Sequence, residues 1–569
     1  MAATLGESTY QAPAIEPQDL STIIDQSWRF RRQLDANNKP LDLATLEDLS
    51  PQALASKHQQ HLTFLAQLDH IDRDKLSPED DINWQILRAQ LQDLADRYRY
   101  KTHYMPITSE YGFHVGISNI ASEFDFSTIE DFENYLTKLT HVQRYFDQQI
   151  YWMRQGIKEG YTQPKAAIKG FEQTIATYIT DDIAESSFYQ PFKNIKLAIS
   201  DREKVQLQTR ANKIIKQQVI ASYQKFYDFM TKEYMVKARA SVGAAAMPNG
   251  IEFYNNRIRH FSTLDLNADQ VHQLGLSEVA RIRAQMDKII KELKFEGSFA
   301  DFLHFLRTDP QFYATTPQQL LEKAAWLAKK ADAILPKLFN TLPRTPYGVE
   351  AVPAAIAPKY TTGRYKGASN DNEPGYYWVN TYALDKRPLY VLPSLTLHEA
   401  VPGHHLQISL NKELTDLPEF RRESYISAFG EGWGLYAEYL GVEANYYSTP
   451  YEQFGRLTYE MWRACRLVVD TGIHAKGWTR QQVLDYMTQN TALSLHNITT
   501  ETDRYITWPG QALSYKIGEL TIKRLRSKAE TSLGDKFDIK EFHQRVLAQG
   551  SVPLTILEQQ IEQYIKEKI

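Results

Sequence analysis

The chain has very little cysteine. Cys465 is the only one among 569 residues, which excludes an intramolecular disulfide. It lies in an apolar stretch with helical spacing, residues 461–469, which favours a buried and unreactive thiol. With 43% hydrophobic and 24% charged residues, the composition is that of a globular protein long enough to bury a large core.

Three further features are missing: a strong charge of one sign, a long apolar run and an export signal. The net charge of −4 gives no electrostatic reason to expect nucleic acid or an anionic membrane as a partner. No segment approaches the roughly 20 apolar residues that span a bilayer, and residues 1–8 lack a basic segment followed by an apolar run. We expect a soluble protein without a transmembrane segment, cytoplasmic as written, or periplasmic or exported if a signal sequence was removed. The sequence leaves the oligomeric state open.

What the sequence does contain is dominated by helix signals. Start signals at Ser127–Glu130, Asn267 and Thr316 precede apolar residues at helical spacing. Residues 203–240 and 553–568 have the same amphipathic period. Because no repeat, low-complexity tract or polar linker divides the chain, we expect a mainly α protein that forms one unit.

The strongest chemical signal is the segment His-Glu-Ala-Val-Pro-Gly-His-His at residues 398–405. A glutamate beside one histidine, with more imidazole a turn or two later, is typical of zinc hydrolases. The usual position of the second ligand, four residues after His398, is taken by Pro402, which has no ligand atom. Because Pro402 should kink or bulge the helix, we expect His398 and His404 to bind the metal, with His405 as the alternate.

A second segment, Phe429–Glu438, can supply the acidic ligand. Glu431 and Glu438 are seven residues apart and therefore share a helix face. Glycines around Glu431 would let its helix approach the histidines closely, so we expect Glu431 to be the third ligand and Glu438 to orient a histidine or act as an alternate ligand. Glu399 is the expected general base for a zinc-activated water. One Zn²⁺ ion is expected, although such ligands also suit manganese or cobalt.

The third cluster covers residues 501–518. Amide hydrolysis passes through an oxyanion that a tyrosine hydroxyl can stabilise, and Tyr515 is the first candidate, with Tyr505 behind it. Arg504 or Lys516 could hold a carboxylate of the substrate. For each of these four residues a purely structural role is an equal alternative.

Proline and glycine break the helical pattern at about residues 343–393. Within this stretch, Tyr376–Thr381 is aromatic and β-branched enough to form a strand, and Leu389–Val391 is a candidate second strand. A small β-sheet element near residues 345–392 would thus directly precede the metal motif. Its edge could receive a substrate backbone by strand addition, with Asn380 as a candidate substrate-binding residue, or it could simply brace the fold.

In these motifs the chain resembles a bacterial family catalogued as domain of unknown function 885 and regarded as zinc peptidases. The resemblance is nearly full length and is carried by residues 267–282, 398–407, 429–440 and 504–518. More distantly, the segment around Glu431 and Glu438 is similar to the third-ligand helix of thimet oligopeptidase-like helical metallopeptidases. That similarity implies that Glu431 binds the metal and Tyr515 stabilises the oxyanion. The chain departs from their motif by two extra residues before His404.

The resemblance implies a two-lobed helical metallopeptidase-like fold around a deep cleft. Residues 1–340 would form a mostly helical N-terminal lobe, and residues 341–569 the metal-binding catalytic part. The expected activity is zinc-dependent hydrolysis of peptide bonds in short peptides, as an endo- or an exopeptidase. Two alternatives stay open: a zinc hydrolase of another amide bond, in an N-acyl amino acid or a cell-wall peptide, and a non-catalytic peptide-binding protein.

Overall fold

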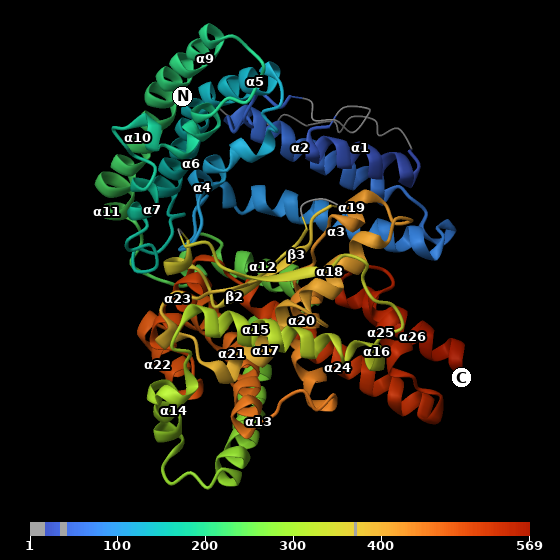
Figure 1. The fold of residues 1–569 in the computed structure, drawn as a ribbon. Helices are drawn as coiled ribbons and strands as arrows, with labels where there is room; N and C mark the ends of the chain where they lie inside the picture. The colour runs from blue at the N-terminus through green and yellow to red at the C-terminus, as the bar shows by residue number, and fades with distance from the viewer. Residues whose placement is uncertain (1–17, 35–41, 355, 369–371) are drawn as a thin grey trace, which may run out of the picture.

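The computed structural model describes residues 18–34, 42–354, 356–368 and 372–569 (Figure 1). In these residues the protein is mainly α-helical with one small three-stranded sheet, which confirms the predicted fold class. Residues 1–8, considered above for an export signal, lie outside the described residues. Within the described ranges, no helix combines the length and the apolar character that a membrane span requires.

The first part of the chain is a succession of helices, drawn in blue to green in the upper part of Figure 1. They are α1 (Leu20–Arg32), α2 (Pro51–Asp69), α3 (Pro78–Arg99), α4 (Phe113–Ser118), α5 (Ile129–Thr140), α6 (Val142–Glu159), α7 (Glu172–Ala176), α8 (Gln190–Lys193), α9 (Asp201–Ile214), α10 (Ala221–Phe229) and α11 (Met235–Lys237). π-Helical turns at Ile215–Ile220 and Met230–Tyr234 join α9, α10 and α11 without interruption. The helix predicted over residues 203–240 is thereby confirmed.

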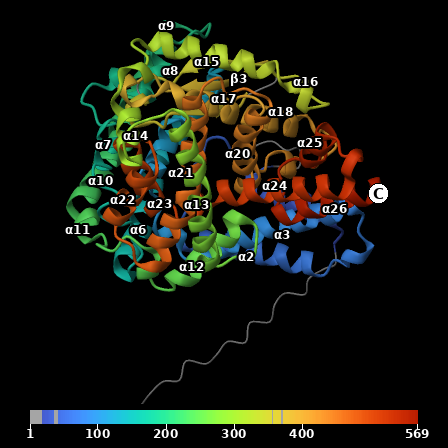
Figure 2. The same ribbon diagram turned by 90° about the horizontal axis from the view of Figure 1, so that it is seen from below.

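Most of the rest of the chain builds the lower part of Figure 1, whereas α19 (Glu419–Arg422) is drawn higher, near α3. Its helices are α12 (Gly250–Ser262), α13 (Ala268–Glu292), α14 (Phe299–Thr308), α15 (Pro317–Asp332), α16 (Leu335–Leu338), α17 (Leu392–Glu399), α18 (His404–Glu413), α19 (Glu419–Arg422), α20 (Ser427–Glu443), α21 (Pro450–Lys476), α22 (Arg480–Asn490), α23 (Leu495–Thr507), α24 (Ser514–Leu533), α25 (Ile539–Leu547) and α26 (Leu554–Lys568). The last of these confirms the helix predicted at 553–568. Figures 1 and 2 show α13 and α21 side by side, and α20 packs on α24.

Two of the three predicted helix starts are confirmed. Asn267 caps α13 and Thr316 caps α15, each accepting a hydrogen bond from a backbone N–H of the first turn. The third prediction, Ser127–Glu130, is one residue off. Thr128 is the N-cap of α5, because Asp131 rather than the preceding glutamate reaches back to form the capping box.

The sheet has the order β1 (Tyr347–Ala351), β3 (Gly375–Val379), β2 (Gly363–Lys366). The central strand β3 is parallel to β1 and antiparallel to β2, with Tyr377 opposite Tyr365. The strand predicted at Tyr376–Thr381 is therefore confirmed as β3. The second predicted strand is wrong: Leu389–Val391 forms a single 3₁₀ turn that leads into α17, since the four residues between Pro388 and Pro393 are too few to pair with a neighbouring strand.

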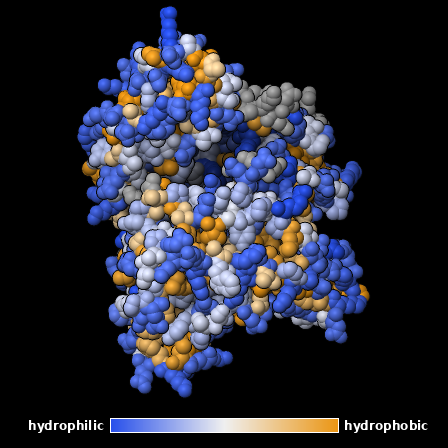
Figure 3. All heavy atoms as spheres, viewed as in Figure 1, coloured by the Kyte–Doolittle hydropathy of each residue, from blue (hydrophilic) through white to orange (hydrophobic). Residues whose placement is uncertain are grey.

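Two clusters of buried apolar side chains hold the fold together. The smaller lies within residues 107–234, and the larger takes in helices from both ends of the chain, including α2, α3, α13, α21 and α24. A cavity of about 1040 Å³ lies where α3, α12 and residues 102–110 face α17, α20, α21, α23 and β2. Figure 3 shows the surface hollowed between the upper and lower parts of the molecule.

Candidate metal centre

The two predicted histidine ligands lie on separate short helices that meet in a tight turn. α17 ends at Glu399 and α18 begins at His404. The turn between them contains a cis Val401–Pro402 bond, and Trp433 of α20 donates a hydrogen bond from Nε1 to the Pro402 carbonyl oxygen at 2.8 Å. The disruption predicted at Pro402 is thus a full break, which frees the two histidines from the spacing of a single helix.

The fold brings His398, His404 and Glu431 together. Nε2 of His398 lies 3.5 Å, and Nε2 of His404 3.4 Å, from Oε2 of Glu431. All three candidate ligand atoms lie within 4.8 Å of one another. Ligands placed tetrahedrally at about 2.1 Å from zinc are about 3.4 Å apart. Both histidine–glutamate separations are therefore those expected of two ligands of one zinc ion.

The charges of these groups are coupled. Burial alone would lower the pKa of His398, but the Glu431 and Glu438 carboxylates raise it to about 9. In return, and against the effect of burial, His404 and His398 hold the pKa of Glu431 well below its usual range. Glu431 is consequently ionised at neutral pH, which is the state that a carboxylate ligand requires.

Glu438 lies behind His398 and is buried. Its Oε1 is 2.8 Å from Nδ1 of His398, and an Arg463 nitrogen lies 3.4 Å from the same oxygen. A carboxylate on Nδ1 leaves Nε2 to face the other two candidate ligands, which is the usual arrangement around a protein-bound metal. Glu438 thus occupies the position expected of a residue that orients a histidine.

Glycines allow α20 to approach its neighbours closely. A Cβ atom on Gly434 would lie 2.7 Å from Cε1 of His398, and one on Gly432 would lie 2.5 Å from the backbone of Gly518 in α24. Any side chain at these two positions would push the helices apart. The glycine-rich sequence therefore places Glu431 against both α17 and α24, the helix that begins at Ser514.

His405 points away from this cluster. Its Nδ1 lies 3.0 Å from the Tyr365 hydroxyl and 3.3 Å from the Ser409 hydroxyl, beneath the sheet. Burial lowers the pKa of His405 to about 4. The alternate ligand of the sequence analysis is thus a packed histidine that supports β2.

Glu399 lines the same cavity as the three candidate ligands. Its Oε2 accepts a hydrogen bond from the backbone N–H of Tyr365 in β2 at 2.7 Å. One carboxylate oxygen is thereby fixed by the sheet, and the other stays free to exchange a proton with a molecule in the cavity.

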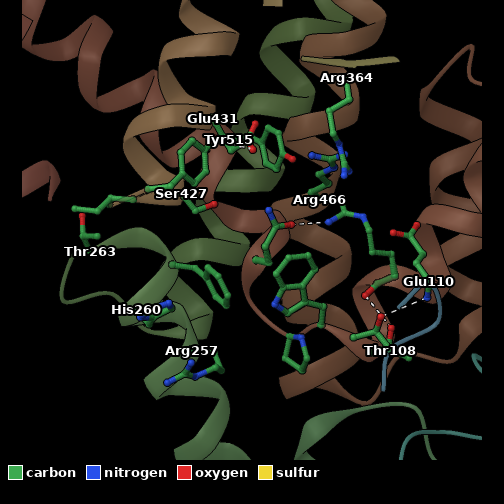
Figure 4. Close-up of a pocket in the computed structure, with 18 of the residues that line it drawn as sticks. Thr108, Glu110, Arg257, His260, Thr263, Arg364, Ser427, Glu431, Arg466 and Tyr515 are labelled. Carbon is green, nitrogen blue, oxygen red and sulfur yellow. Dashed lines mark hydrogen bonds between the residues drawn. The ribbon is translucent and has the colours of Figure 1, made fainter. Parts of the chain in front are cut away.

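Tyr515 stands at the first turn of α24 and also lines the cavity. Its ring is stacked on the His398 imidazole with the centres 6.4 Å apart, and the Arg466 guanidinium carbon lies 4.3 Å from its ring centre. Burial and the Glu431 carboxylate raise the pKa of Tyr515. Its hydroxyl therefore keeps its proton at neutral pH and can donate a hydrogen bond. Figure 4 shows Glu431 and Tyr515 next to each other at one end of the pocket.

Of the four predicted substrate-binding residues, only Arg504 lines the cavity. Lys516 is completely buried and pairs with the carboxylates of Glu278, Glu460 and Glu519 at 2.6 to 3.0 Å. It lies one residue after Tyr515, so the helix turns it about 100° away from the cavity.

Tyr505 and Asn380 are likewise buried and satisfied within the protein. The Tyr505 hydroxyl accepts hydrogen bonds from Trp462 Nε1 and Arg466 Nε at 2.8 and 2.9 Å. The Asn380 amide donates to three backbone carbonyls and accepts from the N–H of Tyr382. Both predictions are wrong, because these polar groups hold the walls of the site rather than face its interior.

The comparisons with known proteins agree with this architecture. A family model described as "Bacterial protein of unknown function (DUF885)" matches residues 36–561. The chain belongs to the DUF885 family. A search of the curated proteins finds no match.

Two solved structures resemble this DUF885 chain, and both carry the description "putative lipoprotein". The one from Colwellia psychrerythraea has 27% sequence identity and a TM-score of 0.88, and the match covers 96% of this chain and 99% of that one. The one from Shewanella oneidensis, of unknown function, has 18% identity and a TM-score of 0.73 over 95% of this chain and 99% of that one, and shows the fold alone.

Three cavity residues of this DUF885 chain were not predicted from the sequence: Tyr425, whose hydroxyl donates to Oε1 of Glu431 at 2.9 Å, Arg364 of β2, and Arg466. A signal did exist for Arg466. Glu460, Arg463, Arg466 and Asp470 recur every three or four residues in an otherwise apolar helix, which marks a buried polar stripe. Nothing in the sequence distinguishes Tyr425 from the other 33 tyrosines.

Proposed function

We propose that this protein is a zinc-dependent peptidase that hydrolyses short peptides in its central cavity. The observation that carries the proposal is the separation of His398 and His404 from Glu431, 3.5 and 3.4 Å, which suits a tetrahedral zinc ion. The carboxylate of Glu438 on the far side of His398 supports it, since a histidine held in this way presents its other nitrogen to a metal.

The donor set suits Zn²⁺ because it consists of two imidazoles and one carboxylate, the composition of many catalytic zinc sites. When bound, the ion would supply Lewis acidity to the substrate carbonyl and to a water molecule. His398, His404 and Glu431 would hold the ion from one side of the cavity.

The protein's own groups would handle the proton and the developing charge. Glu399, held at one oxygen by the N–H of Tyr365, takes a proton from the attacking water and returns it to the leaving amine. Tyr515 keeps its proton and donates its hydroxyl to the oxygen of the scissile carbonyl as that oxygen becomes negative.

The surroundings favour an extended peptide as the substrate. β2 pairs with β3 along one edge only, and residues 361–365 around it line the cavity. An extended peptide could pair with the free edge and lie across Glu399. A cavity of about 1040 Å³ between two parts of the chain would admit short peptides and exclude folded proteins.

The decisive experiment is the Glu399→Gln variant assayed against a library of short peptides. We expect it to retain one zinc per chain and to lose kcat by about two to four orders of magnitude, the range for loss of a general acid–base group. Wild-type turnover in the variant would sink the proposal.

The same assay with a panel of N-acyl amino acids and cell-wall peptides separates peptide hydrolysis from hydrolysis of another amide bond. Failure of the wild-type protein to retain zinc, even after zinc is supplied, would favour a peptide-binding protein instead. The description of the Colwellia neighbour as a putative lipoprotein supports an exported location for this chain, which cell fractionation would test.

A further inference from the structure

The lining of the cavity is unusually rich in arginine. Eight arginines and five glutamates line it, with no lysine and no aspartate among the described lining residues. A metal site formed by two histidines and a glutamate does not explain this surplus of positive charge. Three of these arginines, Arg364, Arg466 and Arg504, lie within electrostatic range of one cavity carboxylate, Glu110.

Arg466 carries the strongest indication of a ligand. It is 3% exposed, and its Nε and one Nη donate to the Tyr505 hydroxyl and to Glu501 at 2.9 and 3.0 Å. Its other Nη is buried and has no hydrogen-bond partner among the described residues. A buried guanidinium N–H without an acceptor is costly, which suggests that the acceptor comes from a bound molecule.

Among the described residues, close ion pairs to these three arginines come from Glu501 alone. Glu501 is shared, since Arg504 also donates to it at 2.9 Å. Arg364 forms no ion pair with any described residue, and its side chain is open to the cavity. Glu110 lines the cavity without an ion pair closer than 4.0 Å to any of the three. An anionic group of a ligand would accept the hydrogen bond that Arg466 leaves unused.

The position of Arg466 determines what such an anion could belong to. The guanidinium lies 4.3 Å from the Tyr515 ring centre, and that ring is stacked on the His398 imidazole at 6.4 Å. Figure 4 shows Arg364 and Arg466 on the side of the pocket where Tyr515 and Glu431 lie. Consecutive Cα atoms of a peptide are about 3.8 Å apart. A carboxylate at Arg466 is therefore one or two residues from a carbonyl at the candidate metal centre.

We propose that Arg466 and Arg364, supported by Arg504, form a subsite for the C-terminal carboxylate of the peptide, so that the enzyme removes one or two residues from a free C-terminus. This inference rests on the proposed peptidase function. Arginine suits the task because its planar guanidinium can donate two parallel hydrogen bonds to a carboxylate. In the reaction, water adds its oxygen to the carbonyl carbon, the C–N bond breaks, and one water proton passes through Glu399 to the leaving nitrogen. The products are a shortened peptide acid and a free amino acid or dipeptide.

The test compares three matched tripeptide substrates: one ending in Phe with a free carboxylate, the same peptide as its C-terminal amide, and an amide ending in Asp. We expect the free acid to be cleaved with a kcat/KM at least about tenfold above both amides, as loss of a charged hydrogen bond predicts. A high rate for the Asp amide alone would assign the arginines to an acidic side chain and overturn the proposal. Equal rates for acid and amide would overturn it while the peptidase function stands.

Variants identify the residues. Arg364→Gln should lower the ratio of kcat/KM for the free acid to kcat/KM for the amide by about tenfold, because only the free acid carries the carboxylate that Arg364 would hold. Lys366→Gln is the matched control, since Lys366 lies two residues along the same strand and does not line the cavity. Glu110→Gln should lower KM for the free acid. An acid-to-amide ratio unchanged in Arg364→Gln contradicts the assignment.

Binding provides a readout that needs no turnover. Calorimetry on metal-free protein should show tighter binding of Ala-Phe than of Ala-Phe amide, and the difference should vanish in Arg466→Met. If the protein hydrolyses nothing but still prefers the free acid, the peptidase function fails and the carboxylate subsite stands. If neither dipeptide binds preferentially and acid and amide are cleaved alike, the subsite is wrong.

Discussion

At the scale of single residues, the site depends on which histidine faces the carboxylates. His404 and His405 are neighbours at the start of α18, yet only His404 lies at 3.4 Å from Glu431, whereas His405 packs against Tyr365. Successive residues of a helix point about 100° apart, so two adjacent imidazoles cannot both reach one ion. The choice between them is set by the break at Pro402, which fixes where the first turn of α18 begins.

Metal content measured by mass spectrometry tests this assignment directly. Wild type should hold about one zinc per chain, and His404→Ala and Glu431→Ala should each lose it. Glu438→Gln should bind zinc about 10- to 100-fold more weakly, because it acts through His398. His405→Ala is the matched control and should keep the metal, although the cavity it leaves lowers the melting temperature. Loss of zinc in His405→Ala alone would reverse the ligand assignment.

At the scale of elements, the site is assembled by helices that come closer than side chains normally allow. α20 touches α17 at Gly434 and α24 at Gly432, and both contacts leave no room for a methyl group. These glycines are unfavourable in a helix by about 1 kcal/mol each relative to alanine. The close approach that they allow places Glu431 beside His398 and Tyr515.

Gly434→Ala tests this packing. The new Cβ would lie 2.7 Å from the His398 ring, so we expect a loss of about 1–3 kcal/mol in the free energy of unfolding, typical of overpacking, together with weaker zinc binding. Gly116→Ala in α4 is the control, since its Cβ would meet only the flexible Tyr111 side chain, at 3.0 Å. Thermal melting and zinc titration of both variants measure these effects. If Gly434→Ala had the melting temperature and the zinc affinity of the wild type, the close approach of the helices would be contradicted.

At the scale of the whole molecule, the buried polar stripe of α21 ties distant parts of the chain together. Glu460 pairs with Lys516 of α24, Arg463 with Glu438 of α20, and Arg466 with Glu501 of α23. Each pair joins α21 to a helix that carries or supports the site. α21 is therefore the support on which the cavity wall is built.

The last member of the stripe predicts how stability depends on pH. Asp470 accepts a hydrogen bond from the Tyr254 hydroxyl at 2.6 Å, and burial raises the pKa of Asp470 from 3.8 to about 7. The folded state therefore keeps a proton that the unfolded state loses above pH 4. Since the folded form then binds more protons than the unfolded form, this residue lowers stability as pH rises from about 4 to 7.

Asp470→Asn removes this titration while keeping an oxygen acceptor for Tyr254. The melting temperature of the variant minus that of wild type should increase between pH 4 and pH 7 and then level off. Thermal melting across this range measures the difference. A difference that is constant with pH would mean that Asp470 does not titrate there in the folded protein.

Much of the candidate site follows from the sequence. Metal chemistry strongly restricts which residue types can form such a site, and the pattern is local in the sequence. It consists of the residue types at 398, 404 and 431, the glutamate beside the first histidine and the glycines around Glu431. The helices and the strand β3 follow from periodicity and capping residues such as Asn267 and Thr316. Local chemistry and local spacing suffice for both.

Only the tertiary structure decided which polar residues of the third segment face the cavity. The sequence offers four polar candidates in this segment without distinguishing their roles: Arg504, Tyr505, Tyr515 and Lys516. In the structure, Tyr505 and Lys516 bind buried partners from α21 and α13. Arg364, whose side chain is open to the cavity, and Arg466, which has an unpaired nitrogen, are 102 residues apart in the sequence, and only the fold brings them to one cavity. The physical reason is that the role of a buried charged group depends on which partners bind it, and those partners are distant in sequence.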